Sequence, residues 1–387
     1  MESLFWLSLA LILYTYAGYP LVLYVWARLR PRPVRKNRAA AEPLVTVVIA
    51  ARNEESSIGK RVENLLAQNY PPQKLEIVVV SDGSTDGTDA IVDALASRQG
   101  AVIRRGKEVH PRIRLARIPE RRGKPNALNR GVELAIGEII VFADARQDFD
   151  ANAVRELVAN FADPSVGSVS GELAFRQSPN ADVQTEIGIY WAIEKWIRKT
   201  EGLVSSTAGA TGAIYAIRRE LFETIPEETL LDDVYVPMKI VCRGFRNAFD
   251  ERAIAHDVFS KGMPAEKRRK IRTLLGNYQL LRLMPELSSP ASNPVFFQFL
   301  SHKVLRLFVP FFFLALLVAS ALAAGSFYRL ALGGIAALAA LAVFKRPLSR
   351  VPVLGRLGAL SSTFLVLNYF AFLAFFHCMR RERAKVW

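Results

Sequence analysis

Charged side chains follow three apolar stretches of this sequence, and their types suit the binding of a nucleotide and a cation. Asp82 ends a β-branched run, and Asp144 follows the apolar run at 138–143. Arg52 and Glu54 follow a third run, LVTVVIAA, which begins at residue 44. A carboxylate can accept hydrogen bonds from a base or ribose, and a second can ligate a hard cation that neutralises a diphosphate. These residues therefore predict a nucleotide site.

The elements predicted around these residues place them at one edge of a sheet. Residues 44–144 alternate short buried strands with helices, which is the period of βαβ units. Ligands of open α/β sheets bind beyond the carboxyl ends of the strands. A plain turn can also carry Asp82-Gly83, so this turn alone leaves both interpretations open. Because GxGxxG does not follow the first strand and GxxxxGK[ST] is absent, dinucleotide-binding and P-loop proteins are disfavoured.

The composition indicates that part of the chain lies in a membrane. Of 387 residues, 51% are hydrophobic, and the net charge is +15. Lys and Arg gather beside the apolar stretches, which favours membrane lipids over nucleic acid as their partner. Cys242 and Cys378 lie far apart without metal-ligand spacing, so neither a disulfide framework nor a zinc site is expected.

Four segments are predicted from the hydropathy pattern. They are an N-terminal transmembrane helix at 1–27, a basic linker at 28–43, an α/β domain with interfacial helices at 44–285, and a C-terminal membrane region of two to three transmembrane helices at 286–387. Basic residues after the first helix predict a cytoplasmic α/β domain. Four full crossings would leave the basic C-terminal tail outside, so one segment is expected to be re-entrant or interfacial.

Two further segments carry charges beside apolar residues, and each allows two interpretations. The helix predicted over 183–200 interleaves aromatic and charged residues, which fits the membrane interface or packing on the sheet equally. The basic stretch at 267–273 fits a site contact or lipid head groups.

Six motifs together resemble the family 2 glycosyltransferases, which have a GT-A nucleotide-sugar-binding domain. The motifs are VVIAARNEE, VVVSDGSTDGT, RRGKPNALN, VFADAR, TGAIYAIRR and LLDDV, in the family's order over about residues 44–280. The resemblance implies an inverting glycosyltransferase of the inner membrane. It also implies a nucleoside-diphosphate sugar, with UDP as the expected nucleotide, and a polysaccharide or lipid-linked acceptor.

The resemblance also implies roles for residues on the donor side. Asp82 matches the Asp that contacts the base, and the turn with Ala50, Arg52 and Glu54 would lie near the base and ribose. Lys124 would lie near the donor phosphates.

Asp144 matches the first Asp of the family's metal-binding DxD motif, which implies Mg²⁺ or Mn²⁺. Arg146 stands where the second Asp is expected, so metal use is an open question. Asp148 is an alternative ligand, and Arg146 can itself pair with phosphate oxygens.

On the acceptor side, Thr211 and Gly212 match a loop near the sugar. Asp233 matches the last Asp of a TED-like motif, the family's general base, and Asp232 takes the Glu position. A base is needed because a sugar hydroxyl is a poor nucleophile until its proton is removed. Helix capping is the alternative role for this pair.

The chain departs from processive members of the family at the QxxRW motif, which contacts the diphosphate side. Arg269 replaces Gln, Arg272 is matched, and Thr273 replaces Trp. A single-addition glycolipid-forming transferase therefore competes with an elongating polysaccharide synthase. A catalytically silent sugar- or lipid-binding component of an export complex is the alternative from another class, although the retained donor-side and base residues favour an enzyme.

Overall fold

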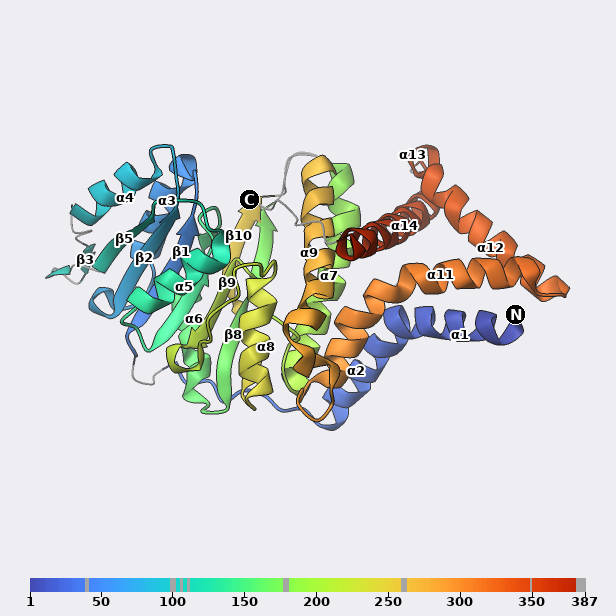
Figure 1. The fold of residues 1–387 in the computed structure, drawn as a ribbon, viewed down its shortest axis with the longest axis horizontal. Coiled ribbons are helices and arrows are strands. Elements are labelled where there is room, and N and C mark those ends of the chain that lie inside the picture. Colours follow the sequence, from blue (N-terminus) through green and yellow to red (C-terminus); the bar gives the residue numbers. More distant parts are fainter. Residues whose placement is uncertain are drawn as a thin grey trace.

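The computed structural model of the chain describes residues 1–38, 42–97, 102–104, 107–109, 112–176, 181–258, 263–348 and 350–380. These residues form an α/β domain and a set of long helices that project from one side of it (Figure 1). Two helices stand between these parts, α7 (Ala181–Val204) and α9 (Met263–Leu283).

One sheet organises the α/β domain. Its strands are β1 (Val45–Ala51), β2 (Leu75–Asp82), β5 (Arg112–Ile118), β6 (Ile139–Ala143), β7 (Asp148–Phe149), β8 (Val166–Arg176), β9 (Ile214–Arg218) and β10 (Arg246–Val258). Over the described residues their order is β5-β2-β1-β6-β9-β8-β10-β7. The first four are mutually parallel, β9 is antiparallel to β6 and β8, and β10 is parallel to β8. This mostly parallel sheet confirms the predicted α/β class.

A separate two-stranded antiparallel sheet pairs β3 (Val102–Arg104) with β4 (Lys107–Val109). Strands of three residues carry too little alternation to be recognised in a sequence, so the motif pattern does not predict this sheet.

Side chains alternate between the two faces of the central strands, so each face has its own apolar core. In β1, Val47 and Ile49 face α3 (Glu55–Leu66), α4 (Thr88–Ser97) and α6 (Ala153–Ala159). Val48 and Ala50 face α5 (Lys124–Leu134) and α8 (Asp232–Cys242). Burial on both faces explains the unbroken apolar runs of these strands.

The core beneath α5 and α8 continues towards the long apolar helices. Leu280 of α9 and Met284 just after it are buried in the same cluster as Met238 of α8. Val295 and Phe299, from the chain that leads into the long apolar helices, complete that cluster. The α/β domain and the segment that leads into the long apolar helices therefore share one apolar interior.

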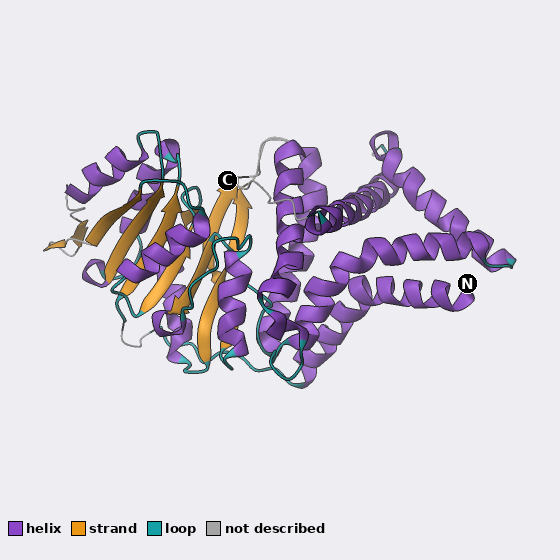
Figure 2. Ribbon diagram, viewed as in Figure 1, coloured by secondary structure: helices purple, strands orange, loops and turns teal. Residues whose placement is uncertain are grey.

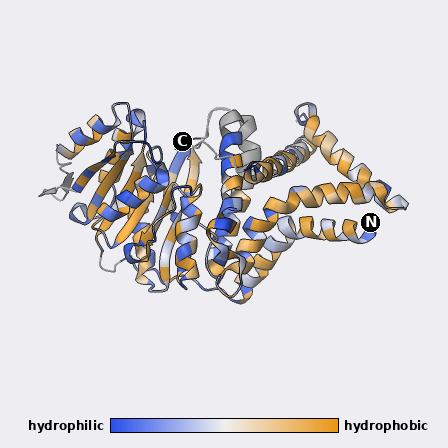
Figure 3. Ribbon diagram, in the orientation of Figure 1, coloured by the Kyte–Doolittle hydropathy of each residue, from blue (hydrophilic) through white to orange (hydrophobic). Residues whose placement is uncertain are grey.

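Among the described residues, four helical stretches are long and apolar enough to cross a membrane: Glu2–Leu29, Phe296–Leu322, Ser326–Val343 and Val353–Met379. Their named helices are α1 (Glu2–Leu13), α2 (Tyr19–Leu29), α10 (Phe296–Gln298), α11 (Leu305–Leu322), α12 (Ser326–Val343) and α14 (Pro352–Met379), and α13 (Lys345–Leu348) is a short connector. Figure 3 shows their largely apolar colouring. The prediction of apolar helices at both ends of the chain is confirmed.

Helices α7 and α9 join the sheet to the apolar helices (Figure 2). Helix α7 contacts β10 on one side and α2 on the other, and α9 contacts α14. Ile197 of α7 is buried with Tyr19 and Leu23 of α2. The aromatic and charged helix predicted over 183–200 therefore packs both on the sheet and on the apolar helix α2.

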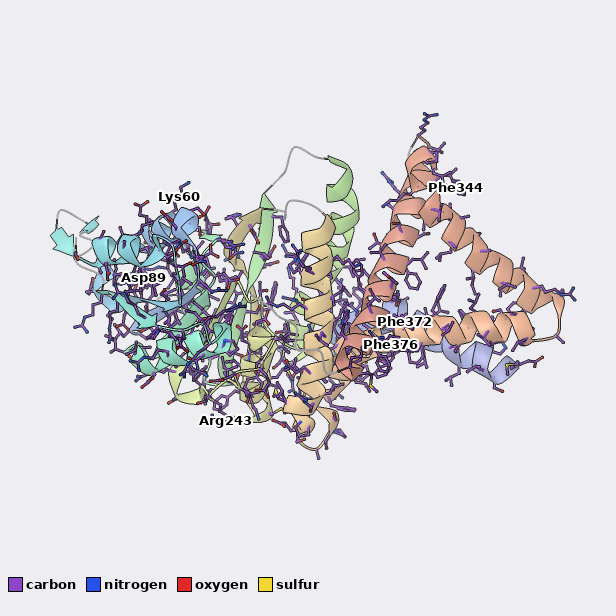
Figure 4. All side chains as sticks on the ribbon, turned by 45° about the horizontal axis from the view of Figure 1, so that its top comes forward. Lys60, Asp89, Arg243, Phe344, Phe372 and Phe376 are labelled. Carbon is purple, nitrogen blue, oxygen red and sulfur yellow. The ribbon has the colours of Figure 1, made fainter. Side chains whose placement is uncertain are left out.

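The end of α14 lies against α9, beside the α/β domain. The ring centroid of Phe375 is 5.9 Å from that of Tyr278 on α9 and 4.9 Å from that of Phe311 on α11. Figure 4 shows the neighbouring Phe372 and Phe376 at the same junction.

The start of α1 lies at the opposite end of the helical bundle. Phe5 is buried with Leu316 and Ala319, near the end of α11, and with Tyr328 at the start of α12. Helix α11 therefore leads away from the α/β domain, and α12 and α14 together lead back to it (Figure 1).

Gly131 marks a close approach of α5 to the sheet. A Cβ added there would lie 2.3 Å from Val48 Cγ1, so α5 would have to move away from β1.

We expect Gly131→Ala to lower the free energy of unfolding by about 1–3 kcal/mol, measured by thermal unfolding of the purified full chain. Gly59→Ala in α3 is the matched control, because its Cβ would meet Ile91 Cγ2 at an ordinary 3.4 Å. Equal melting temperatures for the two variants would contradict this packing.

Candidate active site

Three strand ends meet at one edge of the sheet. Ala51 at the end of β1 lies opposite Ser81 in β2, and Ile49 of β1 lies opposite Ala143, the last residue of β6. The side chains predicted for the donor side at these strand ends are those of Ala50, Arg52, Glu54, Asp82 and Asp144. The parallel register thus brings together residues that are far apart in the sequence.

Asp82 holds the loop that precedes α5. Its side chain is 1% exposed. Oδ1 accepts the backbone N–H of Arg122 at 2.7 Å, and Oδ2 accepts that of Gly123 at 2.8 Å. Gly83 has φ +63°, and a Cβ there would lie 2.9 Å from the nitrogen of Arg121. Asp82, predicted to contact the base, thus also docks this loop on the end of β2.

Lys124 opens α5 directly after this loop. Its Nζ lies 2.9 Å from Asp144 Oδ1 and 3.5 Å from Asp232 Oδ2. Burial by itself would lower the pKa of Lys124, but the two carboxylates outweigh burial and raise it above its usual value. Lys124 is therefore a fixed cation between the end of β6 and the start of α8.

Arg146, at the position of the missing second Asp, pairs with the turn after β1. Its Nε lies 2.9 Å and 3.0 Å from the two carboxylate oxygens of Glu54, and its Nη2 lies 2.8 Å from Oε1. The Arg146 side chain is 70% exposed and that of Glu54 12%. Arg146 thus ties two strand ends together while its guanidinium still faces solvent.

The acidic residues here form no preassembled metal site. In the part of the chain that the structure describes, no three His, Cys, Asp or Glu side chains are grouped to hold a metal by themselves. Mg²⁺ commonly takes only one or two carboxylates, with phosphate and water as the other ligands. Asp144, partly exposed at its strand end, fits such a shared site. Asp148 lies in β7, opposite His256 of β10.

A buried cation, Arg61, lies behind the Asp144 loop, and the motifs gave no indication of it. Its guanidinium lies 3.9 Å from the ring centroid of Phe149 and donates to Asn64 at 2.8 Å. Burial lowers its pKa to about 9, although Asp144 and Asp148 act in the opposite direction. Arg61 therefore adds positive charge beneath the acidic loop.

Asp232 and Asp233 open α8, and neither side chain caps the helix. Asp232 is buried and faces Lys124, whereas Asp233 is partly exposed. A Cβ added to Gly212 would lie 2.9 Å from Asp233 Oδ2, so the loop predicted to border the acceptor passes directly over this carboxylate. The backbone N–H of Ala210 donates to the Asp233 carbonyl at 2.7 Å.

The two adjacent carboxylates differ in their surroundings. Burial and the charge of Asp232 raise the pKa of Asp233. The cations that oppose this rise are Lys124, Lys303 and Arg272. A carboxylate with a raised pKa is a stronger base than an ordinary Asp, which is a chemical property expected of a catalytic base.

The other residues predicted for the acceptor and diphosphate sides lie partly near Asp233 and partly at the surface. Thr211 is buried and bound to Ser170, whose Oγ accepts the Thr211 N–H at 3.0 Å. On α9, Arg272 is close enough to act on the pKa of Asp233, whereas the side chain of Arg269 is exposed. Sequence reasoning missed Lys303, although an ionisable residue at the start of an apolar run is itself a signal of function.

Residues 46–225 match the family model described as Glycosyl transferase family 2. This match runs through the α/β domain from β1 to just beyond β9. The resemblance seen in the motifs is confirmed, and with it the prediction that the chain is a glycosyltransferase.

Two relatives illustrate the range of glycosyltransferases to which the chain is similar. Poly-beta-1,6-N-acetyl-D-glucosamine synthase of Staphylococcus aureus is 22% identical over 241 residues, which cover 61% of this chain and 55% of that protein. Beta-monoglucosyldiacylglycerol synthase of Synechocystis sp. is 27% identical over 203 residues, which cover 51% of this chain and 40% of that protein. The chain spans about half the length of these curated relatives.

A solved glycosyltransferase structure shares the fold over nearly the whole chain. It is the mannosyltransferase PcManGT from Pyrobaculum calidifontis in complex with GDP-Man and Mn²⁺, with a TM-score of 0.74 and 24% identity over 98% of this chain and 99% of that chain. The predicted GT-A fold is thereby confirmed.

Because Asp82 orders the loop before Lys124, we expect Asp82→Ala to weaken UDP binding by about 1–3 kcal/mol. Isothermal titration calorimetry of the purified full chain with UDP will measure this. Asp93→Ala is the control, since Asp93 is exposed on α4 and pairs with Arg117 at the surface. Equal UDP affinity in wild type and a folded Asp82→Ala protein would argue against a donor-side role for Asp82.

Proposed function

We propose that this chain is a membrane-bound inverting glycosyltransferase. It transfers a sugar from a nucleoside-diphosphate sugar, with UDP-sugars tested first, to a polysaccharide or lipid-linked acceptor. The observation that carries the proposal is the position of Asp233, which lies against the Gly212 loop and directly follows Asp232, the partner of the cation Lys124. One relative is named for a polysaccharide and one for a glycolipid, which supports both acceptor classes.

In the proposed reaction, Asp233 accepts the proton of an acceptor hydroxyl while that oxygen attacks the anomeric carbon. The bond from the anomeric carbon to the donor phosphate oxygen breaks, and the nucleoside diphosphate leaves with the electron pair. Attack on the face opposite the leaving group inverts the anomeric configuration. The raised pKa of Asp233 suits it to this role, because base strength rises with pKa.

The leaving diphosphate needs positive charge, and nearby cations can provide it. Lys124 is the first candidate, because Asp144 and Asp232 already hold its ammonium at the strand ends. Arg272, Arg146 and Arg269 are further candidates on the diphosphate side. A divalent metal, Mg²⁺ or Mn²⁺, would be held by Asp144 and would neutralise phosphate charge.

The other proposed contacts follow from where the strand ends and the Gly212 loop place their residues. Asp82 and the turn with Ala50, Arg52 and Glu54 would contact the nucleoside, and Thr211 with Gly212 would border the acceptor. The relative in complex with GDP-Man makes that donor the second to test after UDP-sugars.

The proposed location is the inner membrane, with several crossings and a cytoplasmic catalytic domain. Arg28 and Arg30, at and just after the end of α2, support that orientation by the positive-inside rule. The start of α11 and the end of α14 both pack on α9. This supports a path in which α11 crosses outward and α12 and α14 together return, in line with the expectation that one segment does not cross fully. Residues 381–387 of the basic tail lie outside the described residues.

We expect sugar transfer by the full chain to fall in EDTA and to return with Mg²⁺ or Mn²⁺, because both ions prefer oxygen ligands. Asp144→Asn should also weaken the binding of Mn²⁺ in the presence of UDP, measured by electron paramagnetic resonance. Asp148→Asn tests the alternative ligand. Full turnover by Asp144→Asn in EDTA would exclude Asp144 as a metal ligand.

We expect Asp233→Asn to lower the rate of sugar transfer by about 10²–10⁴ while UDP affinity is retained, because the amide cannot accept the proton. Stopped assays of nucleotide release and calorimetry with UDP measure the two quantities. A folded Asp233→Asn protein with a near wild-type rate would direct the search for the base to Asp232.

The pH dependence of this rate gives an independent check. The rate should rise with pH through the pKa of Asp233, since only the carboxylate accepts the proton. That acid limb should lie above the usual range for Asp. Arg272→Gln removes a cation that lowers this pKa, so it should move the limb to higher pH.

A further inference from the structure

A buried cluster of charged side chains joins α7 to the chain that enters the membrane. Glu194 and Glu201 lie on α7, and His302 lies in the π-helical turn Phe299–Val304 before α11. The imidazole Nε2 lies 3.1 Å from Glu194 Oε2, and Nδ1 lies 2.8 Å from Glu201 Oε1. All three residues are at most 6% exposed. Removing one partner would therefore leave a buried charge without compensation, which is strongly unfavourable.

Two membrane helices contribute further contacts to this cluster. The hydroxyl of Tyr19, on α2, donates to Glu201 Oε1 at 2.5 Å. Arg306, in the first turn of α11, donates through Nη1 to Glu194 Oε2 at 2.9 Å. Glu194 and Glu201 are thus both fixed by groups from the membrane region.

One branch of the cluster reaches the candidate active site through Arg198. This residue lies one turn after Glu194 on α7 and donates through Nε to Glu194 Oε1 at 3.3 Å. Its Nη1 donates to Thr211 Oγ1 at 2.8 Å. Gly212 follows Thr211 and lies directly against the carboxylate of Asp233. A continuous line of contacts therefore runs from membrane helices to the proposed base.

We propose that Arg198 is a positioning residue that holds the acceptor-side loop 207–213 against Asp233. In this proposal, Glu194 orients Arg198, and His302 and Arg306 of the membrane region orient Glu194. The inference rests on the proposed function, because the position of the loop matters for catalysis only if Asp233 is the base.

The chemistry of the two α7 residues suits this task. The planar guanidinium of Arg198 directs its donors along two fixed directions, one towards Glu194 and one towards Thr211. Burial would raise the pKa of Glu194, but the charges of His302, Arg306 and Arg198 outweigh burial and keep it well below its usual value. Glu194 therefore stays ionised and keeps its hold on Arg198.

Hydrogen exchange tests the link without any need for a known acceptor. The amides of Thr207, Ala210 and Thr211 are hydrogen-bonded in the loop, to Asn247, Asp233 and Ser170 respectively. In the full chain in phosphatidylglycerol nanodiscs, we expect Arg198→Gln and His302→Gln to speed exchange over 207–213 by roughly tenfold. Lys199→Gln is the matched control, because the neighbouring Lys199 pairs with Glu251 at the surface.

Kinetics then separate positioning from simple docking of the helices. The donor probes are UDP-glucose, UDP-N-acetylglucosamine and GDP-mannose, and the acceptor probe is dioleoylglycerol in the nanodiscs. We expect Arg198→Gln to lower sugar transfer relative to donor hydrolysis by about 10- to 100-fold, with UDP affinity unchanged. Arg198→Lys keeps the positive charge but lacks the planar guanidinium with its two donor directions. Its ratio of sugar transfer to donor hydrolysis should therefore lie between those of the wild type and Arg198→Gln.

The possible outcomes distinguish this inference from the proposed function. Unchanged loop exchange in both Arg198→Gln and His302→Gln would overturn the inference, whatever the donor or acceptor. Faster exchange with an unchanged ratio of transfer to hydrolysis would mean that the cluster only docks helices, which would overturn it as well. A fully active Asp233→Asn protein would instead refute the proposed base. If the inference holds, Arg198→Gln should cause little further loss in an Asp233→Asn background.

Discussion

The ammonium of Lys124 connects three parts of the domain that are distant in sequence. It stands at the start of α5 and pairs with Asp144 after β6 and with Asp232 at the start of α8. Without this cation the carboxylates would face one another across a partly buried space, where like charges repel strongly. Asp82 docks the loop from which Lys124 emerges, so the position of this cation depends on the end of β2 as well.

This arrangement also separates the roles of two adjacent carboxylates. Asp232 faces Lys124, whereas Asp233 turns towards Gly212 and has a raised pKa. Two neighbouring acids in different surroundings commonly serve different functions in one reaction. Because the Gly212 loop passes so close to Asp233, the surroundings of this carboxylate depend on what holds Thr211, and Arg198 of α7 is bound to Thr211.

The parts of the fold that follow from local pattern were predictable from the sequence. The β-branched runs of β1, β2 and β6, together with their turn residues, indicate parallel strands, and parallel strands bring Asp82 and Asp144 to one edge. Contacts that depend on how distant elements pack were not predictable. Arg146 pairs with Glu54 across 92 positions, and His302 contacts Glu194 across 108. Periodicity reports which face of an element is apolar, but it does not report which partner that face meets.

The apolar interior that runs from Met238 to Phe299 has a consequence for how the enzyme is made. A chain ending at residue 285 would lack Val295 and Phe299, which cover part of the core beneath α8. Such a fragment would present an open apolar face to water, a feature that promotes aggregation. During biosynthesis, the catalytic domain is therefore completed only after the segment that leads into α11 has emerged. Completion of the core beneath α8 is in this way tied to the synthesis of a segment that lies outside the sheet and its covering helices.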